Sequence, residues 1–101
     1  MWIVTFEATL TSAALDADSE AYLETASRLR EIAQEMGCRH FNSVTEHNRE
    51  ITVSIWESEA DIQAWKAQPE HQTAQQTGRE RWYQDYSVLV ASVERQYAFE
   101  S

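Results

Sequence analysis

Successive residues of a β-strand point to opposite faces, and sequence patterns with this period of two predict strands at four places along the chain. The predicted strands cover residues 2–10, 39–47, 51–56 and 86–97. Both faces of the first strand carry apolar residues, so we expect both faces to be covered. Asn48-Arg49 is a predicted short turn, because asparagine tolerates a positive φ, and residues 40–56 should therefore form an antiparallel hairpin.

Two helical regions lie between the predicted strands. After a loop at residues 11–17, Asp18 or Ser19 caps a helix that should end at Gly37, a residue suited to the left-handed position after a helix. Its expected buried stripe is Tyr22, Ala26, Leu29, Ala33 and Met36. The second region runs from the N-cap Ser58 to about Gln84, and Pro69 divides it by occupying the first turn of a second helix.

The order strand, helix, strand, strand, helix, strand predicts an α+β fold of the ferredoxin-like type, βαββαβ, with a four-stranded antiparallel sheet. The length of 101 residues fits a single domain over residues 1–101. Both helical regions should cover the same face of the sheet. The other face would then expose apolar residues, so we expect a homodimer that packs sheet on sheet.

Composition and charge narrow the possible partners. A net charge of −9 repels phosphate backbones and anionic lipids, and no apolar run approaches the ~18 residues of a membrane span. We therefore expect no nucleic-acid and no membrane partner. The single Cys38 cannot form an internal disulfide, which fits a cytoplasmic location, and His40, His47 and His71 lack the spacing of a metal site.

Residues 56–86 hold most of the candidate chemistry, including three of the four tryptophans. His71, Gln75, Gly78 and Trp82 recur at spacings of four, three and four, so they share one helical face that resembles a cavity wall. Imidazole has an ordinary pKa near ~6.5 and suits a proton acceptor, although His71 could equally cap its helix for purely structural reasons. The alternative for Trp82 is plain core packing.

Other residues have a functional and a structural interpretation as well. Trp65 could stack on a substrate or fill the core, and Trp56 could line a pocket or pack in the core or a dimer interface. Tyr86 could orient a substrate or close the junction between helix and strand. His40 and Asn42 would add polar groups to the pocket if their side of the strand faces the helices, and Arg79 and Arg81 favour an ion-pairing surface.

The order of elements and the strings ITVSIWESEADIQAW, PEH, AQQTGRERWY and VERQY resemble the antibiotic biosynthesis monooxygenase (ABM) domain family. The resemblance implies a ferredoxin-like protomer that dimerises into an α+β barrel. Cofactor-free members, which oxygenate phenolic or hydroquinone substrates, carry a tryptophan where Trp56 stands, but their asparagine and tyrosine positions are Thr52 and Ile62 here. Heme-degrading members carry a tryptophan where Trp65 stands, a histidine ligand for the iron and an asparagine on the first strand. Here the ligand position falls on Gln75, one turn after His71, and residues 1–10 contain no asparagine.

Three functions follow as hypotheses. The first is a cofactor-independent monooxygenase for a small aromatic or quinol-type substrate, with His71 as the catalytic proton acceptor. Its substrate-binding residues would be Trp65, Gln75, Trp82, Tyr86 and Trp56. The second is a heme-binding or heme-degrading protein with His71 on the iron, and the third is a non-catalytic dimeric module that binds a small hydrophobic molecule.

Overall fold

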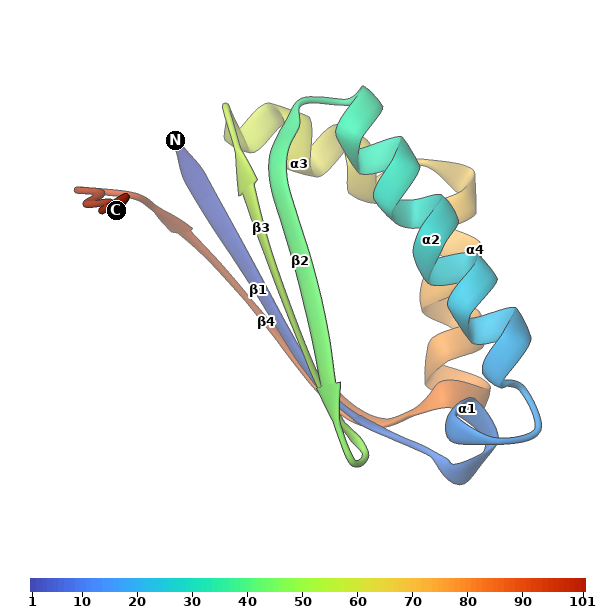
Figure 1. Cartoon of the computed structure of the whole chain (residues 1–101). Coiled ribbons are helices and arrows are strands. Elements are labelled where there is room, and N and C mark those ends of the chain that lie inside the picture. Colours follow the sequence, from blue (N-terminus) through green and yellow to red (C-terminus); the bar gives the residue numbers. More distant parts are fainter.

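The computed structural model describes residues 1–101 and contains one four-stranded sheet covered by helices on one face (Figure 1). The elements are β1 (Trp2–Leu10), α1 (Ser12–Leu15), α2 (Ser19–Glu35), β2 (Cys38–Glu46), β3 (Arg49–Trp56), α3 (Glu59–Lys66), α4 (Pro69–Thr77), the π-helical turn η1 (Gly78–Trp82) and β4 (Tyr83–Ser92). The strand order is β2-β3-β1-β4, and every neighbouring pair is antiparallel. The predicted α+β, ferredoxin-like architecture is therefore confirmed.

The strand register decides which side chains lie beneath the helices. Trp56, Ser54 and Glu50 of β3 are buried on the helix side, so the intervening aliphatic residues of β3 point to the open face. On that open face Val44 is 66% exposed and Leu89 is 70% exposed. The open face of β3 therefore carries aliphatic side chains, whereas its covered face carries Glu50, Ser54 and Trp56.

The core consists of two separate clusters under the helices. One cluster centres on Trp56 and Trp65, and the other joins Tyr22 to Trp82. Members of both clusters border a cavity between the helices and the sheet. The core is therefore divided, and the cavity lies between the two clusters.

The helix ends follow the predicted capping in most places. Ser58 Oγ accepts the backbone N–H of Asp61 at 3.2 Å, and Pro69 occupies the first turn of α4. Gly37 has a φ of 107°, and a Cβ there would lie 2.5 Å from Asp61 Oδ2, so only glycine fits this position. Asp18 precedes α2 but makes no side-chain cap, because its carboxylate instead accepts two hydrogen bonds from Arg81 at 2.8 and 3.1 Å.

Several predicted boundaries are wrong. Residues 11–17 contain the short helix α1, which Thr11 Oγ1 caps by accepting the N–H of Ala14, so the segment is not a simple loop. The hairpin turn is His47-Asn48, and the positive φ of 56° belongs to His47 rather than to asparagine. The helical region ends at Trp82.

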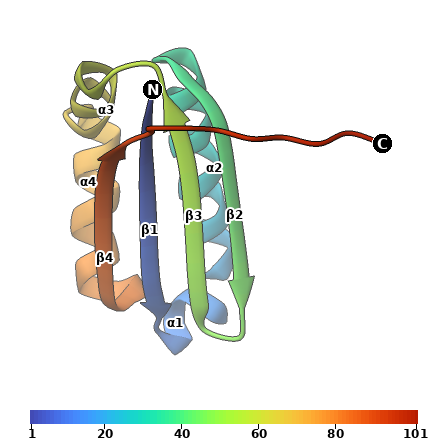
Figure 2. The same cartoon turned by 90° about the vertical axis from the view of Figure 1, so that its left-hand side faces the viewer.

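The last strand is also displaced from its predicted range. β4 begins at Tyr83 rather than Tyr86 and ends at Ser92 rather than at residue 97. The following residues have no regular secondary structure and extend beyond β2 in Figure 2. None of the helices combines the length and the apolar character that crossing a lipid bilayer demands.

Candidate functional site

The cavity between the sheet and the helices has a volume of about 450 Å³. Twenty-six residues border it, and 15 of them are hydrophobic. The floor is the inner face of the sheet, and the walls come from α2, α3 and α4. A largely apolar cavity of this size with a few polar groups is typical of a site for a small organic molecule.

The structure brings five of the six predicted site residues to this cavity. They are Trp65, His71, Gln75, Trp82 and Tyr86. Trp56 does not border it, because its side chain is completely buried in the core and its Nε1 donates to Ser54 Oγ at 2.9 Å. The roles of the five remain predictions, whereas Trp56 is placed as a core residue beside Trp65, with 5.2 Å between ring centroids.

His71 is a half-buried imidazole that packs edge-on against the Trp65 ring, with 4.4 Å between the centroids and 77° between the planes. Its Nδ1 atom is buried and makes no hydrogen bond. Burial and the nearby charge of Lys66 lower the pKa of His71 below its usual range. The neutral imidazole is therefore favoured, and a neutral imidazole carries a lone pair on one of its two ring nitrogens that can accept a proton.

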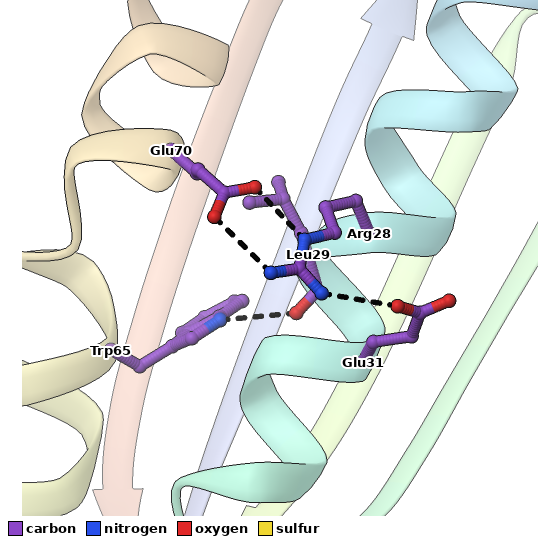
Figure 3. Close-up of polar contacts among 5 residues, drawn as sticks. All are labelled: Arg28, Leu29, Glu31, Trp65 and Glu70. Carbon is purple, nitrogen blue, oxygen red and sulfur yellow. Dashed lines mark hydrogen bonds and ion pairs between the residues drawn. The ribbon is translucent and has the colours of Figure 1, made fainter.

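Hydrogen bonds from Trp65 and Arg28 join α2 to α3 and to α4. Trp65 Nε1 donates to the backbone oxygen of Leu29 at 3.1 Å, which ties α3 to α2 (Figure 3). Beside it, Arg28 of α2 donates to the carboxylate of Glu70 on α4 at 2.9 and 3.3 Å, and it also contacts Glu31 (Figure 3). These contacts fix the spacing of the two helices above the cavity, although an exposed ion pair adds little stability.

Tyr86 presents its hydroxyl near the other end of α4. The oxygen accepts a hydrogen bond from Arg79 Nε at 2.9 Å and a longer one from Gln75 Nε2 at 3.5 Å, and the ring stacks on Phe6 at 5.4 Å. Arg79 is thus engaged with a tyrosine and not with an acid, contrary to the sequence-based expectation. The other predicted ion-pairing residue, Arg81, does pair with Asp18 at 2.8 Å.

Glu50 is the main polar residue of the cavity that sequence reasoning missed. It is 7% exposed, accepts a hydrogen bond from the Tyr22 hydroxyl, and accepts a longer one from Ser43 Oγ at 3.3 Å. Burial raises the pKa of Tyr22 well above its usual range and that of Tyr83 to about 12, so both hydroxyls remain protonated donors. The available signal was the alternation along β3: Glu50 lies six residues before Trp56, an even number, so both side chains point to the same face of the strand.

The remaining polar candidates lie elsewhere. His40 and Asn42 hydrogen-bond to each other at 2.7 Å on the open face of β2 and do not border the cavity. Gly78 leaves room for the Tyr83 ring, which would be 2.5 Å from a Cβ at that position. No three His, Cys, Asp or Glu side chains come together in a way that could hold a metal ion.

Fold and cavity together define a ferredoxin-like α+β protein with a largely apolar cavity between its sheet and helices. The sequence pattern of the family described as antibiotic biosynthesis monooxygenase matches residues 5–77. The chain therefore belongs to this family.

Particular relatives show the same likeness. The chain is 38% identical over 97 residues to the uncharacterized protein YqjZ of Bacillus subtilis, covering 94% of this chain and 85% of that protein. Its fold is similar to that of Rv0793 from Mycobacterium tuberculosis, with a TM-score of 0.76, 13% identity and coverage of 96% and 98% of the two chains. It is also similar to SnoaB, a cofactor-independent oxygenase from Streptomyces nogalater, with a TM-score of 0.73, 13% identity and coverage of 94% of each chain.

Proposed function

We propose that this protein is a cofactor-independent monooxygenase that acts on a small aromatic or quinol-type substrate. The observation that carries the proposal is that His71, an imidazole whose pKa is lowered by burial, borders a cavity lined largely by apolar and aromatic residues. Membership of the monooxygenase family and the fold shared with the cofactor-independent oxygenase SnoaB support this choice.

His71 would accept the proton of a phenolic hydroxyl. The resulting anion is electron-rich enough to react with O2: one oxygen atom enters the quinol ring, the other leaves as water, and the electrons come from oxidation of the ring to a hydroxyquinone. A largely apolar cavity keeps bulk water away from the intermediate. The Trp65 and Trp82 rings would form aromatic walls at the two ends of the cavity, with Trp65 beside His71. Gln75 and the Tyr86 hydroxyl would orient its polar substituents.

Oxygen uptake tests the proposal directly. Purified protein is incubated with a series of hydroquinones in air-saturated buffer, and uptake is compared between the wild type and His71→Ala. We expect His71→Ala to lower the rate by about 10²–10⁴-fold, the usual contribution of a general base. His47→Asn is the matched control, because His47 lies in the exposed hairpin turn and asparagine tolerates its positive φ. Equal rates for wild type and His71→Ala would refute the mechanism, and binding without oxygen uptake would leave a non-catalytic binding module.

The dimer is part of the same proposal. Val44, Ile51 and Leu89 are 66%, 40% and 70% exposed on the open face of the sheet, and a second copy packed face to face would bury them. Light scattering of the wild type should give about twice the mass of the 11.7 kDa chain. Leu89→Asp should shift the mass toward that of the monomer, and a monomeric wild type would contradict the dimer.

Heme does not fit these residues well enough to support a mechanism. Gln75 stands at the ligand position that the family resemblance implies, and its amide is occupied with Tyr86. Glu50 adds a buried negative charge to the cavity, which is unfavourable for the two heme propionates. We expect hemin to show no shift of its Soret band with the protein; a shift that His71→Ala abolishes would reverse this conclusion.

A further inference from the structure

Glu50 is a buried carboxylate without a cationic partner. None of the five ion pairs of the chain includes it, and its hydrogen-bond donors are the neutral hydroxyls of Tyr22 and Ser43. A buried charge of this kind is costly unless something compensates it. Glu50 also borders the cavity, so a ligand can reach it.

The strand register places Glu50 and His71 at opposite ends of the cavity. Glu50 pairs with Ala8 of β1, and Ser54, four residues later on β3, pairs with Phe41 of β2. At the usual rise per strand residue, these two positions of β3 lie about 13 Å apart. Trp65 packs against Phe41 with 6.3 Å between ring centroids, and His71 packs against Trp65 at 4.4 Å. His71 therefore belongs to the Ser54 end.

The His71 end carries the opposite charge. Lys66 and Arg30 both border the cavity there, and Arg30 Cζ lies 5.4 Å from the centroid of the Phe41 ring. Lys66 acts electrostatically on His71: after burial, its positive charge is the second cause that lowers the pKa of the imidazole. Two cationic residues thus border one end of the cavity, the carboxylate of Glu50 borders the other, and aromatic residues line both ends.

We propose that Glu50 is a ligand-binding residue that receives a hydroxyl or amino group at the far end of an elongated aromatic ligand. Each carboxylate oxygen can accept more than the single hydrogen bond it now has, so Glu50 can bind such a donor without giving up Tyr22 or Ser43. The electron-rich or anionic end of the ligand then lies beside His71 and Lys66. This orientation depends on one part of the proposed function, namely that the cavity is the substrate site.

Two matched compounds test the inference. Both 6-hydroxy-2-naphthoate and 2,6-naphthalenedicarboxylate share the rings and one carboxylate, and they differ in whether the other end is a donor or a second anion. Binding is measured at neutral pH by quenching of the Trp65 and Trp82 fluorescence. We expect the wild type to bind the hydroxy acid at least about tenfold more tightly, because a second anion would face the Glu50 carboxylate.

Substitution of Glu50 separates a binding role from a structural one. Glu50→Gln should bring the two affinities to within about threefold of each other, chiefly by improving binding of the dicarboxylate. Glu46→Gln, which removes the same charge from an exposed position outside the cavity, should keep the wild-type ratio. A purely structural Glu50 predicts that Glu50→Gln changes both affinities equally, and that result would overturn the inference.

The wild-type ratio alone decides the matter if Glu50→Gln fails to fold: equal affinities for the two compounds would also overturn the inference. Binding needs no oxygen chemistry, so its outcome is independent of the oxygen-uptake assay. Charge-selective binding without oxygen uptake would refute the monooxygenase and keep the role of Glu50. Oxygen uptake without charge-selective binding would support the monooxygenase and refute the role of Glu50.

Discussion

The hydrogen bond from Tyr22 to Glu50 offers the sharpest test of the structure. It joins α2 to β3 across 28 residues of sequence, and both residues are buried, at 7% exposure each. Tyr22→Phe removes only the hydroxyl and keeps the ring that packs against Trp82, with 5.3 Å between centroids. The substitution therefore isolates the hydrogen bond from the packing.

The expected cost follows from the environment of Glu50. Without the Tyr22 hydroxyl, the buried carboxylate keeps only the 3.3 Å hydrogen bond from Ser43. A hydrogen bond to a charged group contributes about 1.5–3 kcal/mol to the free energy of unfolding. For a domain of this size, a loss of about 2 kcal/mol corresponds to a fall in Tm of roughly 8–16 °C.

Urea denaturation followed by tryptophan fluorescence measures this cost, at one fixed protein concentration because association adds to stability. Tyr86→Phe is the matched control: its hydroxyl contacts an exposed arginine, and we expect a change within about 0.5 kcal/mol. In a double-mutant cycle, Tyr22→Phe and Glu50→Gln should couple by about 1 kcal/mol or more. Additive effects, or a cost for Tyr22→Phe no larger than that of the control, would refute the reasoning.

Four further predictions concern pH, oligomerisation and packing. The lowered pKa of His71 means that the unfolded chain binds a proton more readily, so stability should fall as pH drops below ~6.5, and His71→Phe should reduce this slope in urea titrations. The raised pKa values of Tyr22 and Tyr83 should keep two of the four tyrosines un-ionised above pH ~10 in the folded state, which absorbance at 295 nm would show, and stability should decline from that pH upward. Leu89→Asp should lower the mass measured by light scattering without changing the far-UV circular dichroism of the monomer. Gly78→Ala should destabilise the chain by about 1–3 kcal/mol, because the new methyl group meets the Tyr83 ring, and normal stability would show that the ring has room to move.

The elements of the fold were predictable where local rules agree. Ser58 and Pro69 mark helix starts by their own chemistry, and Gly37 marks a helix end because its φ of 107° suits glycine. The start of β4 was not predictable, because the helical spacing continues through Trp82 and the chain then changes direction within one residue. Tyr83 is drawn into the strand by its pairing with Leu10, a contact that no local pattern reveals.

Most residues of the candidate site were predictable from local patterns, whereas the position of Trp56 was not. The spacing of His71, Gln75 and Trp82 placed them on one face, and the structure brings all three to the cavity. Trp56 and Trp65 are both tryptophans of the same aromatic-rich segment, yet Trp56 is fully buried in the core and does not border the cavity. Burial depends on which strands flank a residue, and the sequence does not carry that information locally.

Periodicity and capping residues, which act over a few residues, therefore determined the order of the elements, the α+β class and the helical face that carries His71. Tertiary structure alone decided which face of β3 the helices cover, and with it the burial of Glu50 beside Tyr22. It also decided that the carboxylate and the imidazole stand at opposite ends of one cavity. The physical reason is that strand register and helix packing are fixed by contacts between residues far apart in the chain, whereas sequence patterns report only on neighbours.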